Sequence, residues 1–338
     1  ASLPKVLIEI INRYEEYDYR SEELHKRFQL EDSILCKNNA YMYPVVDIWV
    51  SFIIDCLELY GFKINSHTFN YSLSCDIDNI ARFSDVPLPR KIYNIITGLV
   101  TNRKDTINYL QNPEYYYHHL DQHNKIDFMM NAADKQDLKI CFNIITSNTS
   151  IRYDYRYRKK TRLKKIIQSI LQKNHFLGIH YSYNALKKGR IINEWRKCNE
   201  YLNEFGLSTI FGRFHYLRIT IPEYLSVLSS SGQIIDETIT FHETGGFRCG
   251  TCKPFKPFNF KSNKEENIIV QPLILMEGSL LGYSANSSEA FKRNFLHLLN
   301  VSKEVNGCFS LLWHNSDLQN EKIDLFKFAL EELSKKLR

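Results

Sequence analysis

The sequence predicts an α/β fold with a mostly parallel sheet or barrel, because strands and helices alternate from residue 69 to residue 338. Two observations lead to this prediction. Short apolar runs of strand length recur, and longer segments with apolar residues at helical spacing separate them. Polar residues suited to catalysis also follow several of these runs, and chemistry in such folds lies at the carboxyl ends of the strands.

The first predicted strand, residues 69–78, alternates apolar and polar residues and ends in two aspartates. The other segments that read as strands are 138–147, 176–182, 207–216, 233–241, 268–277 and 308–314. A polar helical insertion is expected over about 79–135. Further helices are predicted at 187–205, 222–232 and 288–305, followed by a closing helix with Ile323, Phe326, Leu330, Leu333 and Leu337 on one stripe.

The N-terminal part has a different pattern. Residues 1–40 are charged and rich in tyrosine, and a helix is predicted after Pro44 that ends at Gly61. We therefore expect a mostly helical N-terminal extension over residues 1–65 and a barrel over residues 66–338.

Composition narrows the class of protein. The formal net charge of +6 is too small for a dedicated nucleic-acid binder, so no nucleic-acid partner is expected. It suits a phosphate-bearing substrate or an anionic membrane surface. Eight cysteines at irregular spacing indicate reduced thiols, and neither a signal peptide nor a membrane-spanning run is recognisable. We expect a cytoplasmic protein, with contact to the inner membrane face left open and no oligomeric state predicted.

Polar residues at the predicted strand ends should meet at one rim of the barrel. They are Asp76, Asp78, His180, Arg213, His215 and His314. Two carboxylates spaced i, i+2 can divide labour, one as an oxygen ligand of a divalent metal and the other as a free base. A nearby histidine adds a nitrogen ligand suited to Zn, Co, Ni or Fe, and a second histidine can protonate a leaving amine. The set is complete for metal-assisted amide hydrolysis.

Six stretches of the sequence, in this order, resemble the polysaccharide deacetylases of the NodB-homology type, carbohydrate esterase family 4. The stretches are SCDIDN, GIHYSYNA, GRFHYLR, DETITFHETGGFRCGTCKPF, PLILMEG and LLWHN, and they lie within residues 69–316. The likeness is strongest to a bacterial branch with an extra N-terminal region, tied to surface-polysaccharide loci. The resemblance implies a distorted (β/α) barrel that removes an N-acetyl group from a sugar.

The resemblance also implies roles for the matching residues. Asp76 corresponds to the catalytic base, Asp78 to the metal-binding aspartate and His180 to the first histidine of the metal motif. The motif's second histidine is expected four residues later, where this chain has Asn184, a weaker ligand for zinc-like ions. His215 replaces the proline of another motif and could supply the missing nitrogen. The third ligand is left open between His215, Asn184 and none from the protein, with His242 or Glu243 as further candidates.

Two more motifs complete the implied site. Arg213 and Tyr216 fit a motif in which the arginine orients the base and the backbone N–H beside the tyrosine helps to bind the oxyanion. His314 corresponds to the catalytic acid. The residues expected to contact the substrate are Arg248, Trp313 and Tyr181.

Three other patterns are interpreted as structural. Cys249 and Cys252 form a lone CxxC, for which we expect a loop that shapes the sugar site. His119 and His123 have i, i+4 spacing without the glutamate of HExxH, which favours surface or helix packing. The basic, tyrosine-rich run 152–165 indicates a solvated helix face or a diphosphate contact rather than single-stranded nucleic acid.

The expected function is that of a metal-dependent N-deacetylase, with zinc as the first choice of metal and a nucleotide- or lipid-linked sugar as a candidate substrate. The alternative is a non-catalytic sugar-binding relative, or an amidohydrolase acting on another small amide. No GxSxG, Walker or GxGxxG motif is present, so serine-esterase, nucleotide-hydrolysis and dinucleotide chemistry lack support.

Overall fold

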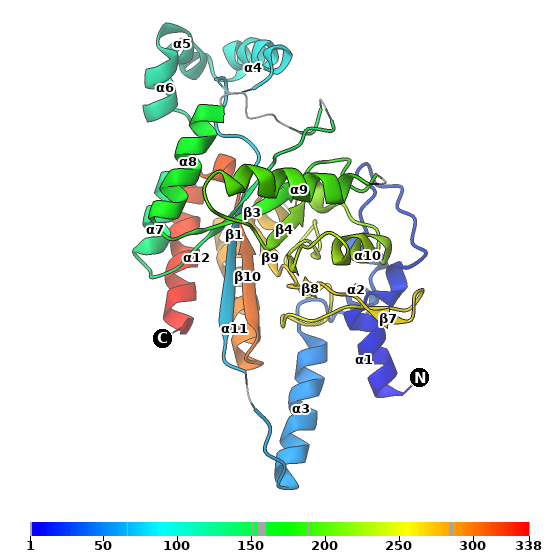
Figure 1. The fold of residues 1–338 in the computed structure, drawn as a ribbon. Helices are drawn as coiled ribbons and strands as arrows, with labels where there is room; N and C mark the ends of the chain where they lie inside the picture. The colour runs from blue at the N-terminus through cyan, green and yellow to red at the C-terminus, as the bar shows by residue number, and fades with distance from the viewer. Residues whose placement is uncertain are drawn as a thin grey trace.

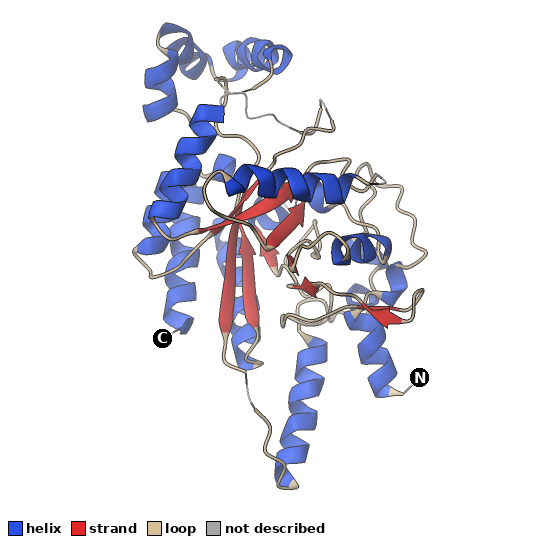
Figure 2. Ribbon diagram, viewed as in Figure 1, coloured by secondary structure: helices blue, strands red, loops and turns tan. Residues whose placement is uncertain are grey.

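The computed structural model describes residues 2–65, 67–84, 86–150, 152–154, 160–187, 189–283 and 287–337. Eight strands form one curled sheet in which all neighbours are parallel, and helices surround it (Figure 1, Figure 2). The fold is therefore a distorted (β/α) barrel, as the sequence predicts.

Neighbouring strands follow the order β8-β5-β4-β3-β2-β1-β10-β9. Their bounds are β1 Asn70–Ile77, β2 Cys141–Ile144, β3 Phe176–Tyr181, β4 Phe211–Phe214, β5 Ile235–Asp236, β8 Ile269–Val270, β9 Leu275–Met276 and β10 Cys308–Leu312. A separate antiparallel hairpin joins β6 Phe258–Asn259 to β7 Lys264–Glu265. The strand that ends beside the two aspartates, β1, lies between β2 and β10 and is paired along both sides.

Four predicted strands are much shorter in the structure, and the segment 138–147 keeps only β2. The segment 268–277 is two strands, and β8 pairs with β5 while β9 pairs with β10 at the opposite edge of the sheet. Pro272 lies between them and lacks the N–H that a continuing strand needs. The segment 268–277 thus supplies the strands at both edges of the sheet, and it brings these two edges together. The segments 207–216 and 233–241 keep only β4 and β5, because the chain turns out of the sheet after each.

Helices occupy most of the chain between the strands. The α-helices are α1 Leu3–Ile11, α2 Ile34–Lys37, α3 Val45–Leu59, α4 Leu88–Thr101, α5 Arg103–Gln111, α6 Pro113–His119, α7 Ile126–Asp134, α8 Lys160–Gln172, α9 Arg190–Asn203, α10 Glu223–Ser229, α11 Ser288–Glu304 and α12 Glu321–Leu337. Shorter turns are η1 Tyr14–Glu16, η2 Leu30–Asp32, η3 His215–Leu217, η4 Ser279–Tyr283 and η5 Asn315–Asp317. Helices α4, α5 and α6 form a lobe that stands away from the rest of the barrel (Figure 1).

The interior of the barrel is polar along β1. Side chains alternate along a strand, so Cys75 and Ile77 face the packed core, whereas Ser72, Ser74 and Asp76 meet polar side chains of other strands. The same alternation places Asp78, one residue beyond β1, on the side of Asp76. The carboxylates therefore reach the rim together.

Buried charges attach the N-terminal extension to the barrel. Glu16 accepts hydrogen bonds from Arg13 Nε at 2.6 Å and from Arg248 Nε at 3.0 Å, and all three side chains are buried. Burial opposes ionisation of Glu16, but the two guanidinium groups outweigh it and lower the pKa of its carboxyl. The division of the chain at residue 65 remains a prediction.

A close backbone contact supports the same attachment. Gly250 has φ +64°, and a side chain there would collide with Ile10 and Val46. The backbone N–H of Val46 also donates to the Gly250 carbonyl at 2.8 Å. The loop that contains the CxxC pair therefore receives α1 and the start of α3.

All eight cysteines are free thiols, and six of them are buried. This agrees with the prediction of reduced core thiols. Within the described ranges, every helix is too short or too polar to cross a bilayer.

Replacing Arg248 with alanine should destabilise the fold. The change breaks a buried ion pair and leaves Glu16 with Arg13 alone, and losses of this kind cost about 3–5 kcal/mol. Urea unfolding followed by circular dichroism measures the loss. As a control, Arg196→Ala removes an exposed pair with Glu200 and should change stability by less than about 1 kcal/mol. Equal stabilities for the two variants would contradict a structural role for Arg248.

Candidate active site

A cavity of about 250 Å³ opens at the carboxyl ends of the strands. Residues that line it include Arg27, Asp76, Asp78, His180, His215, Tyr216 and His314. They come from segments far apart in the sequence, as expected where the ends of parallel strands converge. The volume is below the roughly 300–1,000 Å³ of sites for drug-sized ligands, so the cavity suits a small chemical group.

Asp78, His180 and His215 form a group of potential metal ligands whose donor atoms lie within 4.8 Å of one another. Asp78 Oδ1 is 3.4 Å from His180 Nε2 and 3.3 Å from His215 Nε2. Ligands placed tetrahedrally at about 2.0–2.1 Å from an ion are about 3.3–3.4 Å apart, so this spacing fits a zinc-like ion. Asp78 Oδ1 and His180 Nε2 are buried without a hydrogen-bond partner among the described residues, as ligand atoms would be.

The second ring nitrogen of each histidine faces an acceptor. His180 Nδ1 lies 3.1 Å from the carbonyl oxygen of Arg213, and His215 Nδ1 lies 3.2 Å from Asp154 Oδ1. A nitrogen facing such an acceptor carries a proton, so the other nitrogen, Nε2, is the one directed at the ligand group and available to a metal once it is unprotonated. Both rings are therefore oriented for metal binding before any ion arrives.

The charges in this group are strongly coupled. Burial opposes ionisation of Asp78, but His215 and His180 hold the pKa of its carboxyl well below the usual range. Burial also opposes protonation of His215, yet Asp78 and Asp154 raise the pKa of that imidazole to about 9. A cation that binds here at neutral pH therefore displaces a proton from His215.

Asn184 is directed to a different neighbour. Its side-chain amide donates to the Thr149 carbonyl at 3.0 Å, and its backbone N–H donates to the Thr149 hydroxyl at 2.9 Å. It is absent from the cavity lining, whereas His215 is part of it. The geometry thus favours His215 as the third protein ligand. His242 contacts Glu243 at 3.0 Å, and neither of these lines the cavity.

Asp76 is buried beside the ligand group. Its Oδ1 accepts hydrogen bonds from Asn143 Nδ2 at 2.8 Å and from Arg213 Nη1 at 3.0 Å. Burial opposes its charge, but His180 and Arg213 lower the pKa of the carboxyl, so it stays ionised. Gly178 is the register partner of Asn143, and any side chain at 178 would collide with the Asn143 amide. The glycine therefore leaves room for a group that holds Asp76.

Arg213 crosses the barrel interior and is 1% exposed. Its Nε donates to the Glu237 carbonyl at 2.8 Å, and its Nη2 donates to Ser74 Oγ at 2.8 Å and to Glu237 Oε2 at 3.3 Å. With the bond to Asp76, the guanidinium is surrounded by partners. The orientation of Asp76 is fixed by this side chain.

His314 faces the group from another side. Its Nδ1 lies 2.6 Å from Glu277 Oε1, which also accepts the His314 backbone N–H at 2.7 Å. Its Nε2 is 3.9 Å from Asp78 Oδ2. Burial opposes protonation, but Glu277 raises the pKa of the imidazole to about 10. His314 therefore carries a proton at neutral pH, as a general acid requires.

Tyr216 lies in a strained turn of the cavity wall. Its φ is +59°, and the next residue, Leu217, has φ +56°. Such values are uncommon for residues other than glycine. Both residues line the cavity, so the strain is located at the candidate site.

Three residues expected to contact a substrate do not reach the cavity. Arg248 is held by Glu16, as described above. Tyr181 follows the cavity residue His180, and Trp313 precedes the cavity residue His314. Because side chains alternate along a strand, Tyr181 and Trp313 point away from the cavity. The Tyr181 hydroxyl donates to Gln233 at 2.6 Å, and Trp313 is fully buried among aromatic rings. These expectations are corrected: all three side chains belong to the protein interior.

Three supporting residues were missed by sequence reasoning. Glu277 ends the predicted strand 268–277, so the strand-end rule could have found it. Asn143 lies inside a predicted strand and Asp154 inside the basic run, and neither position carries a signal in the sequence.

The weaker patterns can now be placed. Helix α6 ends at His119, so His119 and His123 do not share a helix. Much of the basic run, residues 155–159, lies outside the described residues. Cys249 and Cys252 are buried in the loop that receives the N-terminal helices rather than at the cavity, and burial raises the pKa of the Cys249 thiol to about 12.

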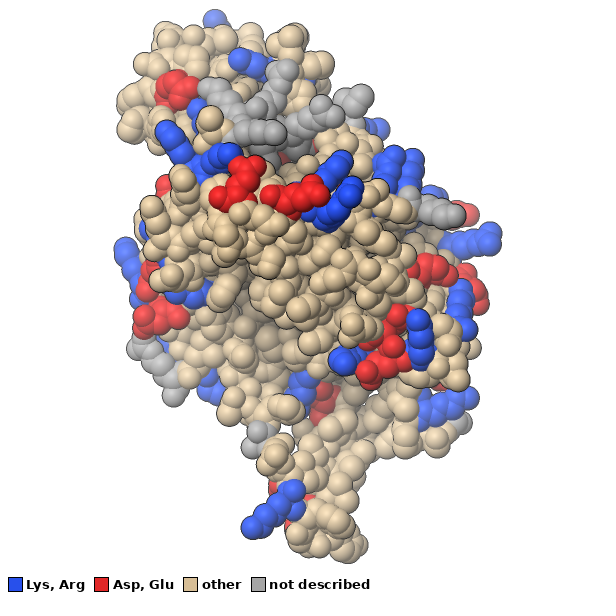
Figure 3. Space-filling view, viewed as in Figure 1, with Lys and Arg blue, Asp and Glu red and all other residues tan. Residues whose placement is uncertain are grey.

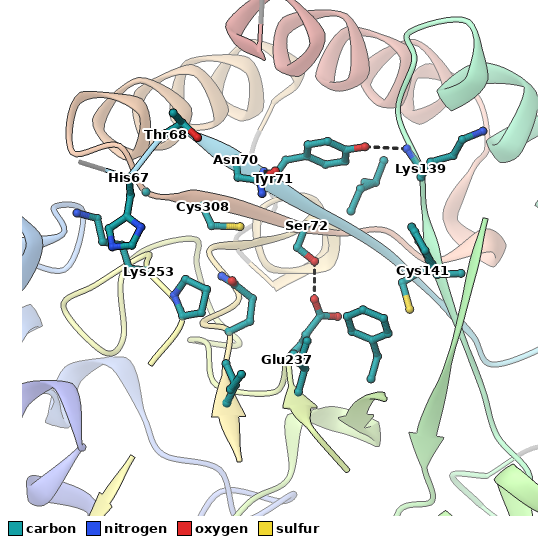
Figure 4. Close-up of a pocket in the computed structure, with 18 of the residues that line it drawn as sticks. His67, Thr68, Asn70, Tyr71, Ser72, Lys139, Cys141, Glu237, Lys253 and Cys308 are labelled. Atoms are coloured by element: carbon teal, nitrogen blue, oxygen red, sulfur yellow. Dashed lines mark hydrogen bonds between the residues drawn. The ribbon is translucent and has the colours of Figure 1, made fainter. Parts of the chain in front are cut away.

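A larger cavity of about 570 Å³ opens at the opposite, amino ends of the strands (Figure 4). Ser72 and Glu237 lie hydrogen-bonded in its wall (Figure 4). Since Glu237 also contacts Arg213, polar side chains connect the two ends of the barrel interior. The ligand group of Asp78 and the two histidines lies only at the other end.

Comparisons of sequence give limited information. A family of unknown function, DUF7033, matches residues 10–61, which begin in the last turn of α1 and include α2 and α3. No curated protein matches the chain significantly.

Comparisons of structure concern the barrel. A protein from Mycobacterium smegmatis assigned to the polysaccharide deacetylases has a TM-score of 0.52 at 11% identity, covering 81% of this chain and 86% of that one. The polysaccharide deacetylase Bc1974 from Bacillus cereus has a TM-score of 0.36 at 12% identity, covering 61% of this chain and 81% of that one. The first similarity, together with the eight-stranded parallel sheet, shows that this chain has the polysaccharide deacetylase fold.

Proposed function

We propose that this protein is a metal-dependent hydrolase that removes an N-acetyl group from a sugar. One observation carries the proposal. A single cavity holds the ligand group of Asp78, His180 and His215, with the ionised Asp76 and the protonated His314 beside it. The polysaccharide deacetylase fold supports a sugar as the substrate.

The proposed reaction is hydrolysis of an amide by water. A divalent ion held by Asp78, His180 and His215 would polarise the carbonyl and make water more acidic. Asp76, oriented by Arg213 and Asn143, takes a proton from the attacking water.

The second half of the reaction needs an acid. His314, kept protonated by Glu277, gives its proton to the departing amine. We assign the backbone N–H of Tyr216, in its left-handed turn, to the developing oxyanion. The products are acetate and an amino sugar.

One carboxylate and two imidazoles suit zinc best, and also cobalt, nickel or iron. We propose zinc, and a nucleotide- or lipid-linked N-acetyl sugar of bacterial surface polysaccharide biosynthesis as the substrate. The mildly basic chain and Arg27, which lines the cavity, support this substrate. Measuring acetate release from a panel of such sugars, with and without a chelator, tests the proposal. No chelator-sensitive release from any of them would refute it.

Asp76→Asn and His314→Gln should each slow acetate release by roughly 10²–10⁴-fold, because each removes a proton-transfer group. Neither residue belongs to the ligand group, so the metal content should stay near that of the wild type. Acetate assays combined with elemental analysis measure both quantities. Wild-type rates in the two variants would reject these roles.

His215→Ala and Asn184→Ala form a matched pair that identifies the third ligand. Loss of a direct ligand should weaken metal affinity by more than the roughly 10–100-fold that loss of an outer partner costs. We expect such a loss for His215→Ala and a near-normal affinity for Asn184→Ala, measured by competition with a zinc chelator. The reverse order would make Asn184 the ligand.

Gly178→Ala should slow turnover by roughly 10–100-fold without loss of metal. The new side chain displaces the Asn143 amide from Asp76, and a hydrogen bond to a charged group is worth about 1.5–3 kcal/mol. Asn143→Ala should have a similar effect, and the double variant should be no slower than either single one. Additive effects on kcat would show that Gly178 acts through something other than Asn143.

A further inference from the structure

Helix α4 presents its apolar side chains to solvent. The exposed ones are Leu88, Ile92, Tyr93, Ile96, Leu99 and Val100, with exposed fractions from 41% to 85%. On the side facing the rest of the protein, Asn94 donates to the Arg82 carbonyl at 2.9 Å and Gly98 lies against Thr106. Among the described residues, only one large apolar side chain of α4, Ile95, packs against a buried cluster on that side. A helix that only covers a core turns its apolar stripe inwards, so the orientation of α4 indicates an external apolar partner.

The charges around this stripe are of one sign. Residues 88–104 include Arg90, Lys91, Arg103 and Lys104 and have no aspartate or glutamate. The first two lie in the first turn of α4 and the other two just beyond its last turn. Arg103 and Lys104 are exposed, whereas Arg90 and Lys91 are partly buried against aromatic rings. An apolar stripe with exposed cations at its end matches the acyl boundary and anionic headgroups of a lipid surface.

Helix α3 provides the contrast. It also exposes large apolar side chains, including Phe52 and Ile53, and in Figure 1 it projects from the opposite end of the molecule to the α4 lobe. Its exposed charges are the two acids Asp55 and Glu58, since Asp47 is buried, and exposed Lys63 follows the helix. An anionic surface would therefore attract α4 more strongly than α3. In the view of Figure 3 both ends are mostly tan, with a few blue and red side chains on each.

We propose that α4 binds in the plane of an anionic lipid bilayer. Its 14 residues make a helix about 21 Å long, which lies flat with Ile92 and Ile96 towards the acyl chains. Since α4 is shorter than the roughly 20 residues of a spanning helix, the contact is peripheral.

The lobe is fixed to the rim of the catalytic cavity. Asn315 Nδ2 donates to the Asn79 carbonyl at 2.8 Å and to the His123 carbonyl at 2.6 Å, and so joins the two ends of the lobe segment. Asn315 directly follows His314. The segment that carries α4 therefore begins and ends near the cavity, so a bilayer bound by α4 could present a lipid-linked sugar to it; only this consequence rests on the proposed function.

Sedimentation of the full chain with vesicles tests the proposal. The probes are vesicles of phosphatidylcholine alone and vesicles that also contain phosphatidylglycerol. We expect binding to the anionic vesicles that is weakened by salt. Ile92→Glu/Ile96→Glu should abolish it, and Arg103→Gln/Lys104→Gln should weaken it by roughly tenfold or more. All four side chains are exposed, so folding should persist, and circular dichroism checks this.

The matched control is Phe52→Glu/Ile53→Glu on α3, which should bind the anionic vesicles like the wild type. Equal loss in the α3 and α4 variants, or no preference for anionic vesicles, would overturn the proposal. So would a dimer that binds no vesicles and dissociates on Ile92→Glu/Ile96→Glu, since the partner would then be a second copy. Acetate release from a water-soluble substrate is measured in parallel, so failure of the hydrolase assignment is recognised separately.

Discussion

The candidate site depends on one buried interaction, the guanidinium of Arg213 held between the carboxylates of Asp76 and Glu237. A charge this deeply buried is tolerated only when it is paired and hydrogen-bonded. Burial opposes the charge of Arg213, but the two carboxylates raise the pKa of its guanidinium. Asp76 belongs to β1, Glu237 directly follows β5, and Arg213 belongs to β4. The ion pairs that neutralise Arg213 therefore also hold the inner faces of these three strands in position. The position of Asp76 follows from that requirement.

The same arrangement recurs around the rim: each reactive side chain is oriented by a partner from a different element. Arg213 orients Asp76, Asp154 faces His215, and Glu277 holds His314. A site is functional only if its groups stay within a few tenths of an ångström of the required geometry, and partners behind the reactive groups provide this. The cavity is therefore organised by contacts that exist without a ligand.

The barrel and the residues at the strand ends could be predicted from the sequence. Strands are recognised from local alternation of apolar and polar residues, and parallel pairing brings their carboxyl ends to one rim. The same alternation would also have excluded Tyr181 and Trp313 as substrate contacts. They adjoin His180 and His314 in the sequence, so their side chains must point the other way. Other features were out of reach. Arg248 is held by Glu16, a residue 232 positions away, and no periodicity reports such a pairing. Asp154 reaches the site from a loop whose path depends on tertiary packing.

The ligand group shows how a chain that departs from a resembled motif can still bring three potential ligand atoms together. The family pattern would place the second histidine at 184, after β3, but the nitrogen that faces Asp78 belongs to His215, after β4. These strands are neighbours, with His180 in register with Arg213, so the turns that follow them meet at one edge of the sheet. A ligand can therefore move from one turn to the next while its donor atom stays near the same point. Asp154 makes the move effective, since it orients the His215 ring in the way a second-layer carboxylate orients zinc-bound histidines. In this chain the nitrogen that completes the group with Asp78 and His180 therefore comes from the turn after β4 rather than from position 184.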